Sequence, residues 1–287
     1  MKLKKILTLL LTVAILLSMA SCGTSKEESD KDKPQKEDKV TVSVDIGIED
    51  GDAEDEDETE KTEAYLICAE YGYEPFAYMD ESLTGFDVDI INKAAELGGF
   101  KVYMSNETYD GGLNALANGD YNGMISAVEK TADRKNYFDF SDPYFTDGIA
   151  VIVKNDSEIK SLFDLDGKTL GVVTDSTSEY VASYDSDAYG YDIVAYENYD
   201  AVYEALGKGS IDALAEEFSS AGWRIYNFNY EMSALPVFLW KTEYYFVVAK
   251  DKNEELLQSF NSALEEMKQS GEYEKILSRY GLNNFVK

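Results

Sequence analysis

The sequence predicts an α/β protein whose strands form mostly parallel sheets. From Ala64 onward, short apolar runs alternate with longer segments whose apolar residues recur at helical spacing, which is the pattern of parallel α/β folds. The chain has 287 residues, of which 44% are hydrophobic, enough for one large domain or two modest ones with a packed core. No segment carries the Gly-rich loop that nucleotide-binding enzymes use to hold phosphate.

The elements follow from this periodicity. GFDVDIINKAAELGG is a predicted helix, because Val88, Ile91 and Ala95 fall on one face and Gly98 closes its end. Further helices are expected at residues 111–119 and 253–281, the second broken at Gly271. The predicted strands are residues 64–70, 100–104, 121–127, 149–154, 169–173, 191–196, 211–216 and 244–250.

FDFSDPYF (138–145) is expected to be a strand that ends in a turn, because Asp-Pro marks a junction between extended chain and turn. Arg134 stands just before it, in a chain with 56 acidic residues against 26 basic ones. Taken alone, Arg134 fits either a solvated charge in the first turn of a helix or a binding group.

The composition excludes several functions. A formal net charge of −30 opposes nucleic-acid binding, which needs a basic face. The absence of histidine removes Ser-His and Cys-His nucleophiles and the commonest zinc ligand. Two cysteines, Cys22 and Cys68, imply no disulfide framework, and Cys68 is predicted to be a buried thiol in the first strand.

Residues 1–22 are predicted to be a lipoprotein signal peptide. The lysines of MKLKK precede the apolar run ILTLLLTVAILL, and SMASC follows it, which is the order typical of export signals. The apolar run is too short for a comfortable membrane span. The MASC ending resembles a bacterial lipobox, with Met19 where Leu is usual. Cys22 is therefore expected to become the N-terminus and to carry acyl chains such as palmitate; a plain cleaved signal is the alternative.

Residues 23–63 are predicted to be an acidic disordered tether. Runs such as EDGDAEDEDETEKTE cannot bury enough surface to fold and repel themselves, and a flexible coil of this length spans roughly 35 Å. A calcium loop is rejected, because no stretch has its alternating ligands, its Gly and its terminal Glu. VTVSVDIGI (40–48) alternates like a strand and is assigned no role.

From residue 64 the chain resembles the extracellular solute-binding proteins that serve ABC importers of polar amino acids, family 3. The matching segments, in the family's order, are YGYEPFAY, LTGFDVDIINKAAELGG, LNALANGDYNGMISAVEKTADR, FDFSDPYF, SLFDLDGKTLGVVTDST, AVYEALGKGSIDALAEE and ALEEMKQSGEYEKI. The resemblance implies a periplasmic-binding-protein fold of two α/β lobes, each a mostly parallel sheet flanked by helices. It places lobe one at 64–148 plus 246–287 and lobe two at 149–245, with IAVIVK and YYFVVAK as crossing hinge strands.

The resemblance also implies a ligand site. In the family, the arginine of the T-x-x-R element, here Thr131 to Arg134, grips the ligand's α-carboxylate. A planar guanidinium can pair a carboxylate with two parallel hydrogen bonds, which lysine cannot do. The aspartates that follow in FDFSDPYF are expected to form turns and not to contact the ligand.

Further contacts carry over by position. Tyr73 and Tyr109 match the family's aromatic walls, which suit an alkyl chain or a cation; packing is the alternative role. Ser126 and Ala127 would contact the ligand through their backbone. Thr177 would open a helix whose free N–H groups meet the carboxylate, and capping that helix is a compatible role.

Three glutamates stand near the implied ligand. Glu217 replaces the usual aspartate at the α-ammonium, with Glu216 as a possible contributor, Glu129 replaces a usual Ser or Thr, and Glu70 lies near the end of the ligand's side chain. Such carboxylates repel one another unless cations compensate, so a cationic ligand is favoured. The alternative is that Glu129 pairs with Arg134 or Lys130.

The implied function is a tethered extracytoplasmic receptor, lipid-anchored to the outer face of the cell membrane, that closes on an amino acid and delivers it to ABC permease subunits. A neutral ligand of the glutamine or cystine type is the alternative. Two other classes stay open: a sensing module that acts through a partner, and a dehydratase-like enzyme with Glu129 and Glu217 as acid and base. We expect a monomer with no catalytic residue, cofactor or metal.

Overall fold

The computed structural model of the chain describes residues 41–42 and 62–283. The predicted signal peptide, with Cys22, lies outside these residues, as does the predicted tether apart from residues 41–42 and 62–63. The strands are β1 (Thr41–Val42), β2 (Ala64–Ala69), β3 (Tyr78–Met79), β4 (Leu83–Thr84), β5 (Lys101–Asn106), β6 (Gly123–Glu129), β7 (Phe138–Lys154), β8 (Thr169–Val173), β9 (Asp192–Tyr196), β10 (Ala213–Glu217) and β11 (Met232–Ala249). The helices are α1 (Phe86–Gly98), α2 (Tyr109–Asn118), α3 (Thr177–Tyr189), α4 (Tyr199–Lys208), α5 (Phe218–Phe228), α6 (Glu254–Ser270) and α7 (Glu272–Arg279), with 3-10 turns η1 (Arg134–Asn136) and η2 (Leu162–Leu165).

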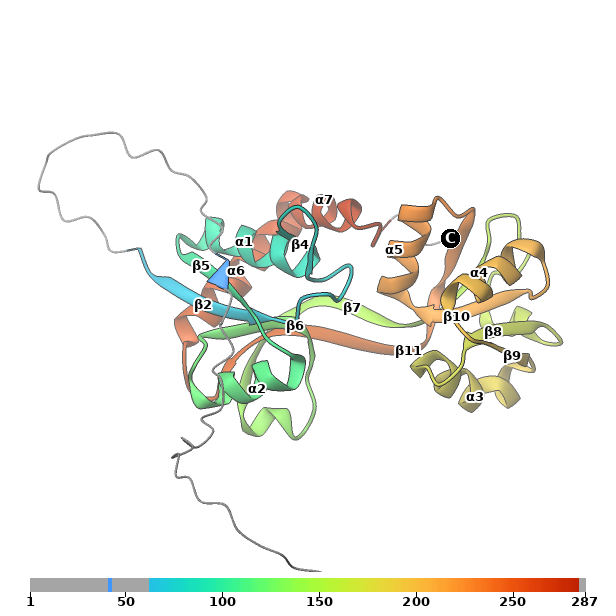
Figure 1. The fold of residues 1–287 in the computed structure, drawn as a ribbon, viewed down its shortest axis with the longest axis horizontal. Helices are drawn as coiled ribbons and strands as arrows, with labels where there is room; N and C mark the ends of the chain where they lie inside the picture. Colours follow the sequence, from blue (N-terminus) through green and yellow to red (C-terminus); the bar gives the residue numbers. More distant parts are fainter. Residues whose placement is uncertain (1–40, 43–61, 284–287) are drawn as a thin grey trace, which may run out of the picture. The chain divides into compact units, whose positions relative to one another are not determined.

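A nine-stranded sheet runs through the described residues in the order β1-β5-β2-β6-β11-β7-β10-β8-β9 (Figure 1). β2 is parallel to β5 and β6 on one side of the central pair, and β8 is parallel to β9 and β10 on the other. β7 and β11 are antiparallel to each other and to their outer neighbours. Two α/β halves are thus joined by two long strands, which confirms the predicted fold class. The residue boundaries of the two lobes stay a prediction.

The two joining strands are longer than the sequence predicts. IAVIVK and YYFVVAK form only the last parts of β7 and β11, and β7 continues through Asp142-Pro143, where the sequence predicts a turn. Pro143 pairs with Tyr245 at a shift in register, and the Asp142 N–H donates to the Asn261 side chain at 2.8 Å. Since proline offers no N–H to a ladder, it is tolerated at such an irregularity, and the strand goes on.

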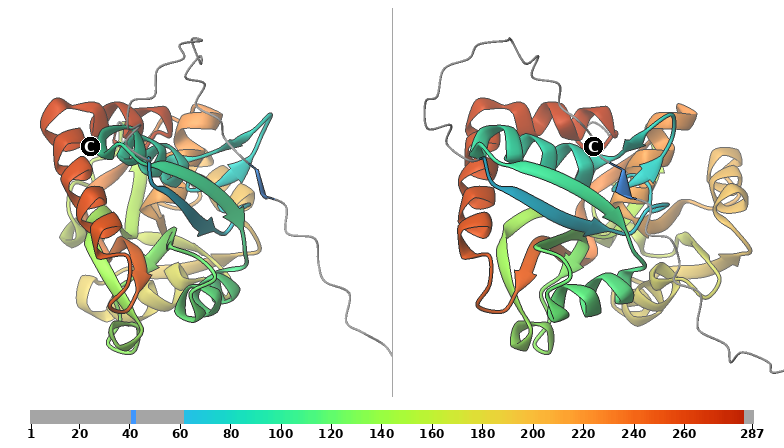
Figure 2. Two further views of the ribbon diagram at one scale, coloured as in Figure 1. Left: turned by 90° about the vertical axis from the view of Figure 1, so that its left-hand side faces the viewer. Right: turned by 60° about the vertical axis from the view of Figure 1, so that its left-hand side comes forward.

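One hydrophobic core includes both the first helix and the last ones. α6 and α7 pack beside α1 (Figure 2). Phe86, the first residue of α1, is fully buried against the rings of Tyr144 and Phe145 in β7. Phe260 of α6 stacks on Phe246 of β11 with ring centroids 4.7 Å apart. The C-terminal helices therefore complete the hydrophobic core of the half that contains β2 and β6.

Hydroxyl side chains cap the helices α2 and α3. Thr108 caps α2 by accepting the Gly111 N–H at 3.2 Å, and Ser176 caps α3 by accepting the Glu179 N–H at 3.1 Å. The predicted helix start at Thr177 is therefore right, whereas the capping role belongs to Ser176.

Cys68 in β2 is fully buried, as predicted, with its sulfur 3.7 Å from the Gly123 carbonyl oxygen.

Candidate functional site

Arg134 is held at the start of η1 by its own sequence motif. The Thr131 hydroxyl accepts the Arg134 backbone N–H at 3.3 Å, which explains the T-x-x-R spacing. Nη1 of the half-buried guanidinium donates to the Glu129 carbonyl at 3.1 Å, and its central carbon lies 5.3 Å from the centroid of the Tyr109 ring. Among the described residues no carboxylate forms an ion pair with Arg134. In the part of the chain that the structure describes, neutral groups position this cation and no acidic side chain pairs with it.

A polar pocket of about 320 Å³ opens beside this guanidinium. It lies where β2 and β6 end, and the carboxyl ends of parallel strands are where open α/β sheets bind their ligands. Its lining residues are Glu70, Tyr73, Tyr109, Ser126, Ala127, Glu129, Arg134 and Tyr244. The structure thus brings together most of the residues that the sequence singled out, and it adds Tyr244.

Two predicted aromatic walls, Tyr73 and Tyr109, line this pocket. Tyr73 is held in a tight turn by a backbone bridge to Ala77, and its ring centroid lies 5.1 Å from that of Phe76. Tyr109 is the first residue of α2. Burial raises the pKa of both phenols, so both are neutral hydrogen-bonding groups at physiological pH.

The pocket's two carboxylates accept hydrogen bonds from neutral donors. A side-chain oxygen of Glu70 accepts the Tyr109 N–H at 3.4 Å, a contact with the N-terminus of α2. A side-chain oxygen of Glu129 accepts the Thr242 hydroxyl at 2.8 Å. Neither carboxylate forms an ion pair within the described part of the chain.

Within the described residues the Glu129 carboxylate forms no ion pair with Arg134 or Lys130, and whether it contacts a ligand stays a prediction. Arg134 bonds to the backbone carbonyl of Glu129, not to its carboxylate. The Lys130 ammonium lies over two aromatic rings, 5.3 Å from the centroid of Phe140 and 5.1 Å from that of Tyr245. A cation over an aromatic face is itself favourable, so Lys130 is drawn away from the pocket.

Ser126 and Ala127 form the buried wall at the end of β6. The Ser126 hydroxyl accepts the Glu70 N–H at 3.1 Å and so fastens β6 to the end of β2. Ala127 has a φ of 48°, in the left-handed region that non-glycine residues rarely adopt. Its backbone N–H donates to the Tyr144 hydroxyl at 3.2 Å.

Thr177 and Glu217 do not line this pocket. Thr177 is exposed at the start of α3, and Glu217 ends β10, where one of its oxygens accepts the Tyr199 hydroxyl at 3.3 Å. Both belong to the half of the sheet formed by β8, β9 and β10. Their contact with a ligand stays a prediction.

Glu216 points to the opposite face of β10 from Glu217, as alternation along a strand requires. It is fully buried, where it accepts the Tyr203 hydroxyl at 2.7 Å and Nε of Arg224 at 3.0 Å. Burial raises the pKa of Glu216 to about 7. This carboxylate is committed to a buried network and does not line the pocket.

Sequence reasoning missed Tyr244 and its partner Asp147. The Tyr244 hydroxyl donates to a carboxylate oxygen of Asp147 at 3.2 Å, across the joining strands. Asp147 is fully buried and also accepts the Ser219 hydroxyl at 2.6 Å, the Ser219 N–H at 3.1 Å and the Gly148 N–H at 2.8 Å. Burial raises its pKa, while these hydrogen bonds oppose the rise. Asp147 thus ties the pocket wall to the N-terminus of α5.

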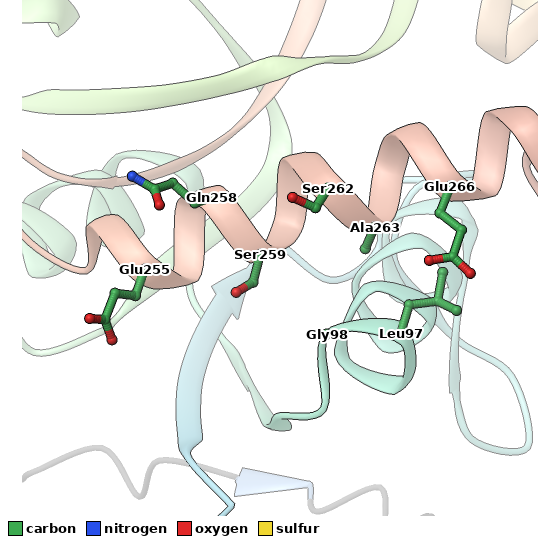
Figure 3. Close-up of a pocket in the computed structure, with 8 residues that line it drawn as sticks. All are labelled: Leu97, Gly98, Glu255, Gln258, Ser259, Ser262, Ala263 and Glu266. Carbon is green, nitrogen blue, oxygen red and sulfur yellow. The ribbon is translucent and has the colours of Figure 1, made fainter.

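Another surface pocket, of about 400 Å³, lies between the end of α1 and the side of α6 (Figure 3). Its lining residues are Leu97, Gly98, Glu255, Gln258, Ser259, Ser262, Ala263 and Glu266. It contains no cation that could bind a carboxylate and none of the residues predicted to bind a ligand. Within residues 41–42 and 62–283, no group of His, Cys, Asp or Glu side chains is arranged to hold a metal ion. None of the helices described is both long and apolar enough to span a membrane.

The two-lobed sheet and the pocket at its strand ends define the class of periplasmic-type solute receptors. Residues 65–283 match the family described as bacterial extracellular solute-binding proteins, family 3, and the chain belongs to that family. Its members are binding proteins and not enzymes, so the dehydratase-like alternative is not supported.

Named relatives share about a third or less of their residues with the chain. A probable histidine-binding protein of Neisseria gonorrhoeae is 31% identical over 76% of this chain and 83% of its own length. The arginine-binding extracellular protein ArtP of Bacillus subtilis is 29% identical over 72% and 82%. Substrate binding domain 2 of Lactococcus lactis GlnP, solved in an open conformation, is 29% identical, covers 77% of this chain and 97% of its own, and superimposes with a TM-score of 0.71.

Proposed function

We propose that the protein is an amino-acid receptor of an ABC importer, with its binding pocket beside Arg134. The observation that carries the proposal is the guanidinium itself, which neutral groups hold at the pocket and no acidic side chain of the described residues neutralises. A fixed, planar cation of this kind fits a ligand carboxylate. Relatives named for binding histidine and arginine support the same class of ligand.

The proposed orientation follows from the charges around the pocket. The ligand's α-carboxylate binds Arg134, and its side chain extends between Tyr73 and Tyr109 toward Glu70. Closure of the half that carries Thr177 and Glu217 then adds the remaining contacts, with Glu217 at the α-ammonium. Ligand contacts made only in the closed form stabilise that form. In this proposal the lobes are 64–148 plus 246–287 and 149–245, and the closed monomer delivers its ligand to permease subunits.

A cationic amino acid is the proposed ligand, and a neutral one such as glutamine or cystine is the runner-up. Glu70 and Glu129 line the pocket, and Glu217 ends β10 in the other half of the sheet. None of the three forms an ion pair within the described residues. Their hydrogen bonds come from a backbone N–H and two hydroxyls, none of which carries a full positive charge. A lysine, arginine or ornithine side chain supplies the missing positive charge.

Competition calorimetry tests the ligand's charge. Wild-type protein is expected to prefer lysine, arginine or ornithine over glutamine and to reject glutamate, because like charges repel. Glu70→Gln and Glu129→Gln, made separately, should each weaken binding of the cationic ligand about tenfold, the size of a lost contact to a charged group, and should affect glutamine less. Glu74→Gln is the matched control, since this exposed acid does not line the pocket. A wild-type preference for a neutral or acidic amino acid would reject the cationic ligand.

The membrane tether is proposed from the sequence ending in MASC. Cys22→Ser should release the protein into the medium or leave it with its signal attached, because the acylated side chain is removed. Fractionation and mass spectrometry of the N-terminus measure both outcomes. A Cys22→Ser protein that is mature and still fully membrane-bound would contradict the lipid anchor.

A further inference from the structure

The backbone of Ala127 is unusual in a wall of the proposed binding pocket. Its φ of 48° lies where an alanine side chain is disfavoured, yet the residue is buried within β6. Such a conformation persists only where the surroundings hold it, and it is found preferentially at functional sites. Ala127 stands between Ser126 and the Glu129 carbonyl that positions Arg134. The backbone conformation of Ala127 therefore affects where these pocket groups lie.

The group that holds Ala127 comes from a strand that is not its neighbour. β11 lies between β6 and β7, yet the hydroxyl of Tyr144 in β7 accepts the Ala127 N–H at 3.2 Å. Tyr144 is fully buried, and its ring stacks on Phe86 with centroids 6.1 Å apart. The Tyr144 backbone carbonyl accepts the Tyr273 hydroxyl at 2.5 Å. The hydroxyl is thus rigidly placed and takes no part in the strand ladder.

A buried carboxylate lies near this hydroxyl. Asp87, in the first turn of α1, is fully buried, and neither of its oxygens makes a hydrogen bond of regular geometry within the described residues. Burial raises the pKa of Asp87 to about 7, and the nearby Tyr144 hydroxyl and Ala127 N–H oppose that rise. Because the Tyr144 hydroxyl accepts the Ala127 N–H, its own hydrogen is free to be donated, and the Asp87 carboxylate is a nearby acceptor.

We propose that Asp87 and Tyr144 are positioning residues for the binding site. The Asp87 carboxylate accepts a hydrogen bond from the Tyr144 hydroxyl, and the same hydroxyl accepts one from the Ala127 N–H. This hydrogen-bond relay fixes the left-handed backbone of Ala127, which shapes the pocket wall. Neither side chain lines the pocket, so both act through Ala127. The proposal rests on the proposed function for its effect on affinity, whereas the relay itself exists without ligand.

Tyr144→Phe removes the hydroxyl and keeps the ring. Its Kd for the preferred amino acid should rise about tenfold, the equivalent of one lost hydrogen bond. Adding Ala127→Gly to Tyr144→Phe should return the Kd to within about threefold of wild type, because glycine adopts a positive φ without help. Asp87→Ala should resemble Tyr144→Phe, whereas Asp87→Asn, which keeps an acceptor oxygen, should stay near wild type.

Tyr191→Phe is the matched control. The buried Tyr191 hydroxyl donates to the Ala182 carbonyl oxygen at 2.7 Å, and neither residue lines the pocket. Tyr191→Phe should lower the melting temperature without changing the Kd. An unchanged Kd in Tyr144→Phe, or a loss that Ala127→Gly does not repair, would overturn the proposal.

Amide hydrogen exchange in the unliganded protein separates this proposal from the proposed function. The Ala127 N–H should exchange at least tenfold faster in Tyr144→Phe than in wild type, in line with one lost hydrogen bond. If wild-type protein binds no amino acid, the proposed function fails and the exchange rate alone decides the relay. Equal protection of Ala127 in the two proteins would reject it.

Discussion

Arg134→Ala should weaken amino-acid binding by about 3–5 kcal/mol, the cost of removing one partner from a buried ion pair. The ligand's carboxylate would then enter the pocket with no cation to meet it, because Lys130 is held over the rings of Phe140 and Tyr245. Arg134→Lys should also bind poorly, since an ammonium cannot form the two parallel hydrogen bonds of a guanidinium. Isothermal titration calorimetry measures both.

Lys135→Ala is the control for Arg134, because Lys135 follows it in η1, is exposed and does not line the pocket. It removes the same charge and should leave the affinity nearly unchanged. Unchanged affinity in Arg134→Ala, or an equal loss in Lys135→Ala, would place the carboxylate site elsewhere.

Asp147→Ala should lower the free energy of unfolding by about 3–4 kcal/mol, because it leaves several buried hydrogen-bond donors without an acceptor. The Ser219 hydroxyl and N–H, the Gly148 N–H and the Tyr244 hydroxyl all lose their acceptor. Asp147→Asn keeps one carbonyl oxygen and should cost less. Urea denaturation with linear extrapolation measures the difference.

Asp156→Ala is the comparison for this loss. Asp156 is an exposed acid whose oxygen lies 3.9 Å from the Lys154 ammonium, and such surface pairs contribute less than about 1 kcal/mol. A loss of under about 1 kcal/mol in Asp147→Ala would show that the cluster joining β7, β11 and α5 is not a main source of stability.

The sequence predicts regular elements well where a periodic apolar pattern extends over a whole element. The helix at 85–99 and the strand at 169–173 are found within one residue of their expected ends. The turn expected at Pro143 fails, because a shift in register allows the strand to accommodate a residue that donates no hydrogen bond. Local rules cannot foresee this, since the accommodation depends on β11, about a hundred residues further along the chain.

The pocket was predictable to the extent that its residues lie in or near the segments that match the family. Tyr244 and Asp147 were missed because they are 97 residues apart and only the fold brings them together. The left-handed Ala127 was missed for the opposite reason, since an alanine in an apolar run gives no sign of a positive φ. The roles proposed for Thr177 and Glu217 require the proposed closing movement, which neither local pattern nor packing determines.

The position of β11 has a consequence for the order in which the chain can fold. β11 is the last strand in the sequence, yet it lies between β6 and β7. β7, β8, β9 and β10 can pair with one another once residue 217 is available, whereas β6 and β7 each keep one open edge until residues 232–249 pair with them. Pairings between residues so far apart in sequence slow folding. Until they form, the open edges of β6 and β7 can pair with another chain, so aggregation during folding is expected to begin at the two edges that β11 later covers.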